Sequence, residues 1–247
     1  GNHLILLAKN YKGYQNLLKL TSISHIDGMY YKPRIDKELL EKYSEGIIVS
    51  SGCLSGEVAQ HIMTGNFDKA KETILWFKSV FGDDYYLEIM RHKNDDPRLK
   101  IDVWENQVKV NKVIRELAKE LDIKVIATND SHFINPEDAE AHDVLVCLST
   151  GRYFDDPSRM RYTGQEWFKT NAEMNRLFAD IPEALTNTVE LAEKVEAYEL
   201  NSDPIMPEFA IPTDFATIDQ YKEKFTEEQL IEEFTQKSFD RLGGYSS

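Results

Sequence analysis

Short apolar runs alternate with longer stretches of helical spacing through the middle of this chain. Each apolar run is followed by a polar turn, and then by apolar residues that recur every three or four positions. Strands that alternate with helices are typical of a parallel sheet or barrel built from βαβ units, so we predict an α/β fold. The predicted strands cover 46–50, 85–90 and 124–128, and the predicted helices between them cover 57–61, 68–80 and 100–121.

The segments on either side extend this pattern. An apolar run over 4–8 predicts a buried strand or the start of a helix. After 128 we expect a capped helix over 135–150, an irregular loop over 151–165, helices over 171–177 and 181–195, an extended linker with three prolines over 201–213, and an acidic amphipathic helix over 226–242.

The chain is acidic, and this limits how it can contact nucleic acid. Its 247 residues include 29 Lys and Arg against 43 Asp and Glu, which gives a net charge of −14, and 41% hydrophobic residues are enough for a folded core. A domain that binds DNA by itself usually presents a basic face, because phosphate contacts supply most of the affinity. Any nucleic-acid contact is therefore expected to be local or carried by a partner.

Motifs that define a compartment or a common catalytic site are missing. No apolar run approaches the roughly 18 residues needed to cross a membrane, and two cysteines are too few for a disulfide framework. A cytoplasmic protein without membrane partners is therefore expected. The sequence has no nucleophile elbow, phosphate-binding loop or dinucleotide fingerprint. If the chain supports chemistry, hydrolysis by a metal-activated water fits best.

Metal-binding side chains follow three successive predicted strands. Cys53, His92 and Asp130 with His132 each lie just after an apolar run. Because the carboxyl ends of parallel strands share one edge of a sheet, these residues are expected to meet there. Thiolate, imidazole and carboxylate are the usual ligands of zinc and related divalent ions, and the Asp-x-His spacing places both side chains on one side of an extended segment. Their joint placement predicts a metal site.

The remaining histidines and cysteine have simpler interpretations. His25 is expected in a solvated loop, His61 on a helix surface and His142 packed in a helix, and Cys147 is expected in the core. His3 lies at the first apolar run and could face the same edge as the metal candidates.

A basic pair, Lys32 and Arg34, stands beside two tyrosines at 30–31 and could contact phosphate. Two basic residues in an acidic chain are a small signal, and packing of the tyrosines is the alternative.

Together these motifs resemble the PHP (polymerase and histidinol phosphatase) domain family, in the form found in the alpha subunits of bacterial DNA polymerase III. The motifs occur in the family's order and cover nearly the whole chain. They are the strings at 6–10 and 13–17, 30–36, 51–57, 86–89 closed by His92, 127–132, 141–145 and 187–192.

The resemblance implies a distorted (β/α)7 barrel with a cluster of divalent metal ions at its strand ends. In family members that keep the cluster, the positions matching Cys53, His92, Asp130 and His132 are ligands of zinc, manganese or iron, and His3 matches another less clearly. The implied activity is a 3′–5′ exonuclease or phosphoesterase, or support of proofreading. Where ligands are lost, the domain is a scaffold that docks the proofreading exonuclease subunit. A stand-alone phosphatase is a third possibility, disfavoured by the polymerase-type motif at 30–36.

The chain departs from the family pattern at its beginning. The family opens with a His-x-His strand and carries an acidic bridging ligand, and neither is found here. We therefore expect a partial barrel that lacks its first strands over 1–200, followed by a linker and helical entry to the polymerase palm domain over 201–247. The parent would polymerise DNA with magnesium, whereas this piece would lack that active site. An open barrel also predicts marginal stability or self-association.

Overall fold

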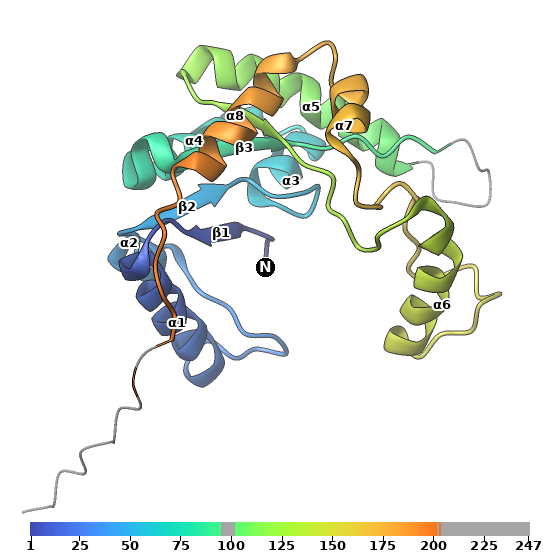
Figure 1. The fold of residues 1–247 in the computed structure, drawn as a ribbon, viewed down its shortest axis with the longest axis horizontal. Helices are drawn as coiled ribbons and strands as arrows, with labels where there is room; N and C mark the ends of the chain where they lie inside the picture. The colour runs from blue at the N-terminus through green and yellow to red at the C-terminus, as the bar shows by residue number, and fades with distance from the viewer. Residues whose placement is uncertain (95–101, 202, 204–247) are drawn as a thin grey trace, which may run out of the picture. The chain divides into compact units, whose positions relative to one another are not determined.

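The computed structural model describes residues 1–94, 102–201 and 203, and its centre is a four-stranded sheet (Figure 1). Strands β1 (Ile5–Ala8), β2 (Ile47–Ser50), β3 (Tyr85–Ile89) and β4 (Val125–Ala127) lie side by side in chain order. Strands β2, β3 and β4 are parallel, whereas β1 runs antiparallel to β2. The predicted α/β fold is confirmed, and β1 is the strand that departs from a purely parallel sheet.

Helices connect the parallel strands by the expected crossovers. Helices α3 (Glu57–Met63) and α4 (Phe67–Phe81) link β2 to β3, and α5 (Asp102–Leu121) links β3 to β4. Every residue of these three strands is buried, which explains why they read as continuous apolar runs rather than as alternating ones. The predicted strands and helices of this region are confirmed to within a few residues.

Alternate strand residues face two different groups of helices. Val49 and Leu87 belong to the larger core cluster, with apolar residues of α3, α4 and α5. Ile48 and Ile126 belong to a second cluster, which Leu191 of helix α8 (Pro182–Glu193) completes. The strict alternation of side chains along a strand therefore decides which helices each residue contacts.

Helix α8 also covers the outer edge of β4. The Asn187 amide donates to the Val125 carbonyl over 2.8 Å, and the Ala127 amide donates to the Thr188 hydroxyl over 3.2 Å. These side chains take the backbone groups that a further strand would use. The sheet edge is thereby satisfied without another strand.

Two helices were not predicted from the sequence. Helix α1 (Tyr11–Ile26) begins at Asn10, whose side chain accepts a hydrogen bond from the Gly13 amide at 3.0 Å. Helix α2 (Lys37–Lys42) begins at Asp36, which caps it in the same way. The expectation that His25 lies in a loop is wrong, because His25 belongs to the last turn of α1. Its ring bonds to the Thr21 carbonyl one turn earlier, a partner that only the helix supplies.

The later elements follow the predictions. A short 3-10 turn, η2 (Pro136–Asp138), leads into α6 (Ala139–Thr150) through a capping box of Asn135 and Asp138. An irregular loop follows, and then α7 (Asn171–Leu177) and α8. The predicted linker and final acidic helix lie outside the described residues, except for 201 and 203. Within the described ranges, no helix is both long and apolar enough to span a bilayer.

Strand β1 leaves apolar surface at the edge of the sheet. Ile5 and Leu7 pair across to Ser50 and Ile48, yet their side chains remain 44% and 40% exposed. Among the described residues β1 has a strand partner on one side only. This edge is what the prediction of self-association requires, and the association itself stays a prediction.

Candidate metal site at the strand ends

His3 and Cys53 lie together because β1 is antiparallel to β2. The residues before β1 are thereby placed beside the residues that follow β2, and the His3 amide donates to the Ser55 carbonyl over 2.9 Å. Gly52 turns the chain with a φ of 75°, a left-handed conformation that favours glycine. Cys53 Sγ then lies 3.6 Å from Nδ1 of His3. The sequence could not settle the position of His3, and the structure places it at the strand ends.

Asp130 and His132 form a second pair, after β4. Asp130 Oδ1 lies 3.5 Å from Nε2 of His132, and the two side chains are 45% and 34% exposed. Asp130 has a φ of 44°, in the left-handed region that Asp and Asn tolerate better than most residues. The backbone therefore bends at Asp130, and both side chains stay open to an incoming ligand.

Both pairs have spacings that suit two ligands of one ion. Bonds of about 2.0–2.3 Å at a tetrahedral angle place two ligand atoms about 3.4–3.6 Å apart. The distances of 3.6 Å in the His3–Cys53 pair and 3.5 Å in the Asp130–His132 pair agree with this value. No group of three or more His, Cys, Asp or Glu with metal-binding geometry occurs in the described part of the chain. The residues fit a metal as two half-sites, not as one complete cluster.

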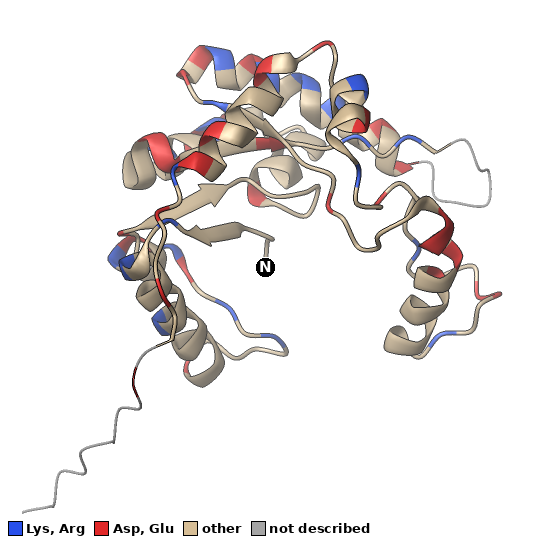
Figure 2. Cartoon of the chain, in the orientation of Figure 1, with Lys and Arg blue, Asp and Glu red and all other residues tan. Residues whose placement is uncertain are grey.

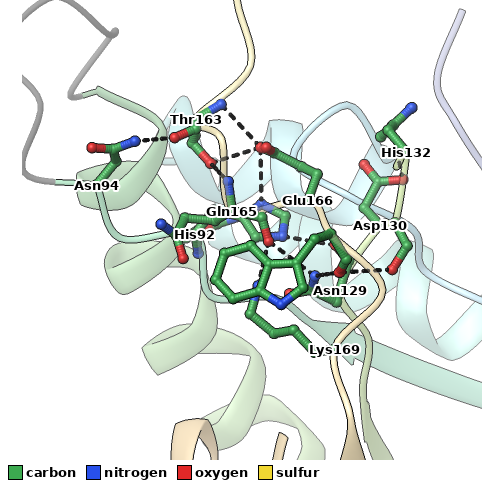
Figure 3. Close-up of polar contacts among 12 residues, drawn as sticks. His92, Asn94, Asn129, Asp130, His132, Thr163, Gln165, Glu166 and Lys169 are labelled. Carbon is green, nitrogen blue, oxygen red and sulfur yellow. Dashed lines mark hydrogen bonds and ion pairs between the residues drawn. The ribbon is translucent and has the colours of Figure 1, made fainter. Parts of the chain in front are cut away.

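His92, the fifth predicted ligand, lies in a buried polar network (Figure 3). It is only 4% exposed, and Nε2 lies 3.0 Å from the Asn129 carbonyl, so Nε2 must carry the proton. Nδ1 accepts a hydrogen bond from the Gln107 amide at 3.1 Å. Burial lowers the pKa of His92, although the nearby Glu166 carboxylate opposes the shift. His92 is therefore neutral with both ring nitrogens in use, and it would reach a metal only by giving up one of these bonds.

Glu166, the acidic member of this network, was not predicted from the sequence. Glu166 is 3% exposed, and its Oε1 lies 3.8 Å from Nδ1 of His92 while accepting bonds from the Thr163 amide at 3.0 Å and hydroxyl at 2.7 Å. Its Oε2 is buried without a hydrogen-bond partner among the described residues. Glu166 comes from the irregular loop, where no periodicity marks a residue as buried.

The segment around Glu166 is joined to the end of β4. The Glu166 carbonyl accepts from the His132 amide at 2.8 Å, and Asn129 donates to the Gln165 and Trp167 carbonyls at 3.0 and 2.8 Å (Figure 3). Nearby, burial lowers the pKa of the Lys169 ammonium to about 8. The loop thus extends the hydrogen-bonding of the sheet beyond the strand end and fixes the backbone that carries Asp130 and His132.

Tyr162 stands beside the Asp130–His132 pair and was also missed. Its ring centroid lies 4.5 Å from that of His132 and 4.8 Å from that of His142. Burial, followed by the charges of Asp130, Glu166 and Cys53, raises the pKa of the Tyr162 hydroxyl. A cavity of about 650 Å³, lined in part by Tyr162 and His142, opens at this point. The site therefore has a protonated phenol and space for a ligand next to the exposed pair.

Glu88 ties the three parallel strands together beneath these residues. It is buried in β3 and accepts hydrogen bonds from the Ser50 hydroxyl of β2 and, over 2.5 Å, from the Thr128 hydroxyl that follows β4. The Ser51 hydroxyl accepts from the Glu88 amide at 2.9 Å. A carboxylate inside an apolar strand is the sequence signal that could have revealed this link, because buried charges need partners.

The other sequence candidates have the following positions. His142 packs between Phe133 and Tyr162, and Cys147 is buried, in agreement with the predicted structural roles. His61 is partly buried on α3, 3.9 Å from Glu57. Lys32 and Arg34 are exposed in the loop between α1 and α2.

Comparison with known proteins supports the resemblance seen in the motifs. The PHP domain family model matches residues 1–92. A protein named DNA polymerase III subunit alpha from Borreliella burgdorferi is 46% identical over 230 residues, which is 92% of this chain and 19% of that protein. Proteins of the same name from Campylobacter jejuni and Helicobacter pylori are 46% and 40% identical, each over 87% of this chain and 18% of their own length. The chain spans about a fifth of the curated relatives it matches.

Proposed function

Because the chain belongs to the PHP domain family of DNA polymerase III alpha subunits, we propose that it is part of a bacterial replicative polymerase. We also propose that the residues at its strand ends hold divalent metal ions for phosphodiester hydrolysis. The reaction would be 3′–5′ exonuclease or phosphoesterase cleavage, or a contribution to proofreading. The proposal rests on the two ligand pairs, His3–Cys53 and Asp130–His132, with their spacings of 3.6 and 3.5 Å.

Each pair suits a different part of this role. The thiolate and imidazole of His3–Cys53 favour zinc or iron, whereas the carboxylate and imidazole of Asp130–His132 also suit manganese. A bound divalent ion would supply an activated water and neutralise phosphate charge. Further metal ligands would come from segments of the alpha subunit that this chain does not contain. Nucleotide addition with magnesium would also take place in those segments.

The chain's own groups would prepare the site for a phosphate. Tyr162 is protonated at neutral pH, as tyrosines ordinarily are, and burial moves its pKa further upward, so its hydroxyl can donate a hydrogen bond to a phosphate oxygen beside His132. Glu88 holds the strand ends in register through Ser50 and Thr128. The segment around Glu166 excludes water from the floor of the site, since His92 and Glu166 are both almost fully buried.

A scaffold role is the second candidate, and the buried His92 favours it. A ligand whose two ring nitrogens are already bonded suggests a site that has lost its metal. In that case the domain would hold the rest of the alpha chain and the proofreading exonuclease subunit, and would meet DNA through the parent polymerase. A stand-alone phosphatase is disfavoured, since the similarity to polymerase subunits extends over 92% of the chain. We place the chain and these partners in the cytoplasm.

Metal content tests the proposal directly. The purified chain would be analysed for zinc, manganese and iron, and then titrated with each ion. We expect bound or readily acquired metal whose uptake falls at least tenfold in His132→Ala and in Cys53→Ser. His25→Ala is the matched control, because His25 lies far along α1 and bonds within its own helix. A chain that takes up no metal, or variants that bind as well as the wild type, would leave the scaffold role.

A further inference from the structure

The loop between α1 and α2 presents two tyrosines to solvent. Tyr30 is 65% exposed and Tyr31 is 89% exposed, although both are large aromatic residues. The alternative interpretation, packing of the tyrosines, applies only to their contact with each other, since neither ring is buried. Lys32 and Arg34 follow them and are also exposed, and Figure 2 marks basic residues along this loop. We call these four residues the tyrosine platform.

The platform is held in shape by its backbone and by ring contacts. The Tyr30 amide donates to the Lys32 carbonyl at 3.1 Å, and the Arg34 amide donates to the Gly28 carbonyl at 3.2 Å. The two tyrosine rings meet edge to face with centroids 4.8 Å apart, and the Arg34 guanidinium lies 5.3 Å from the Tyr30 ring. The aromatic surface is thus preorganised, which lowers the entropy cost of binding.

Tyr31 adopts a left-handed backbone conformation that is unfavourable for an aromatic residue. Its φ of 59° is left-handed, where an aromatic side chain is sterically disfavoured. Such strain is commonly retained at functional sites, and here no burial of the ring offsets it, since Tyr31 is 89% exposed. The ring stays at the surface, where it contacts the Tyr30 ring and is accessible to a ligand.

The platform lies beside one of the two ligand pairs. A Cβ placed on Gly1 would stand 3.6 Å from Nε of Arg34, and His3 follows two residues later. Arg34 is therefore next to the segment that carries the His3–Cys53 pair. A strand whose phosphate contacts Arg34 would therefore pass beside the segment that leads to His3.

We propose that the tyrosine platform binds single-stranded DNA, with bases stacked on Tyr30 and Tyr31 and phosphates at Lys32 and Arg34. This rests on the proposed function and names its substrate as an unpaired DNA end. Stacking on exposed aromatic rings suits unpaired bases of any sequence, whereas a duplex hides its base faces. Two basic residues suffice because stacking supplies much of the affinity, and the net charge of −14 disfavours DNA elsewhere on the chain.

Two acidic residues border the platform without blocking it. Asp36 is engaged as the cap of α2, where it accepts a hydrogen bond from the Leu39 amide at 2.9 Å. Asp27 is the C-cap residue of α1, at the other end of the loop. Of the two basic side chains between them, Arg34 lies against the Tyr30 ring.

Binding of a fluorescein-labelled oligothymidylate to the 247-residue chain tests this, with EDTA present so that metal has no part. We expect anisotropy to rise on binding, and the double variant Tyr30→Ala/Tyr31→Ala to weaken the affinity about tenfold or more. Tyr153→Ala is the matched control, because Tyr153 is 84% exposed on a different loop. In Lys32→Gln/Arg34→Gln, the slope of log affinity against log salt should fall by about 1.4, for two phosphate contacts on a single strand.

Each outcome separates this inference from the metal proposal. Absence of binding at low salt, or equal binding by the tyrosine variant and the wild type, overturns the platform even if the chain takes up metal. Loss confined to the tyrosine and basic variants supports it even if the chain takes up none. If double-stranded DNA binds as tightly as oligothymidylate, the stacking mode is wrong.

Discussion

His92 and His132 follow neighbouring strands, yet the structure gives them opposite surroundings. His92 is 4% exposed and bonded at both ring nitrogens, whereas the His132 side chain is 34% exposed and paired with Asp130. The difference comes from the loop around Glu166, which covers the first histidine and leaves the second open. Residue type at a strand end therefore does not decide between ligand and structural residue. The burial of the side chain and the hydrogen-bond partners of its two ring nitrogens decide whether such a histidine can bind a metal.

Replacing His92 should show the largest effect on stability. In His92→Ala the Gln107 amide and the Asn129 carbonyl lose their buried partner, so we expect a loss of about 3 kcal/mol in the free energy of unfolding. Urea denaturation followed by circular dichroism measures it, with His25→Ala as the exposed control. A change within the error of the control would mean that the network does not hold the loop.

Replacing Asp130 should lower metal affinity strongly and stability only slightly, in contrast to replacing His92. Asp130→Asn keeps a residue that tolerates the φ of 44° but removes the charged ligand, so we expect metal affinity to fall about 30- to 100-fold. The free energy of unfolding without metal should change by no more than about 0.5 kcal/mol, because the side chain is exposed. Asp83→Asn, an exposed acidic residue in the 3-10 turn between α4 and β3, is the control for lost charge. Unchanged metal affinity in Asp130→Asn would remove the contrast between the two histidines.

The link through Glu88 predicts an intermediate loss. Thr128→Val preserves side-chain shape but leaves one buried carboxylate oxygen of Glu88 without its donor, which should cost about 1–2 kcal/mol. Thr150→Val is matched to it, since the Thr150 hydroxyl donates to carbonyls of its own helix α6, those of Val146 and Cys147, and not to a buried carboxylate. Equal unfolding midpoints for the two variants would show that Glu88 does not tie the strands.

The smallest expected effect is a change of the free energy of unfolding with pH that depends on the buried His92. The folded pKa of His92 is lowered by burial, so in the range below about 6.5 the unfolded chain binds more protons than the folded one. Stability then rises with pH within that range and gains nothing further from His92 above it. In His92→Gln the dependence of stability on pH below 6.5 should be shallower than in the wild type. A steeper dependence would mean that folded His92 carries a charge.

The sequence allowed prediction of the parts of the fold that repeat. Strands β2, β3 and β4 and their crossover helices were predicted because buried runs and helical spacing alternate there. Helix α1 was missed because its apolar residues form only a weak stripe along a largely polar helix. The antiparallel β1 could not be foreseen either, since its direction depends on contacts with β2.

For the candidate site, the sequence indicated which residues could act as ligands but not which residues surround them. Cys53, Asp130 and His132 were predicted as ligands from their places after strands, and the structure adds which residue each lies beside. Metal binding by them stays a prediction. Glu166 and Tyr162 were missed because they come from the irregular loop, whose path over the strand ends depends on hydrogen bonds such as that from the His132 amide to the Glu166 carbonyl. Such long-range contacts leave no periodic signal in a sequence.

Cobalt spectroscopy of the chain tests the central claim, that the exposed pairs bind metal, most directly. Cobalt bound by Cys53 and His3 should give a thiolate-to-cobalt absorption band that disappears in Cys53→Ser and persists in Cys147→Ser, because Cys147 is buried in the core. It should also persist in His92→Ala. No thiolate band in the wild type, or a band that survives Cys53→Ser, would contradict the account.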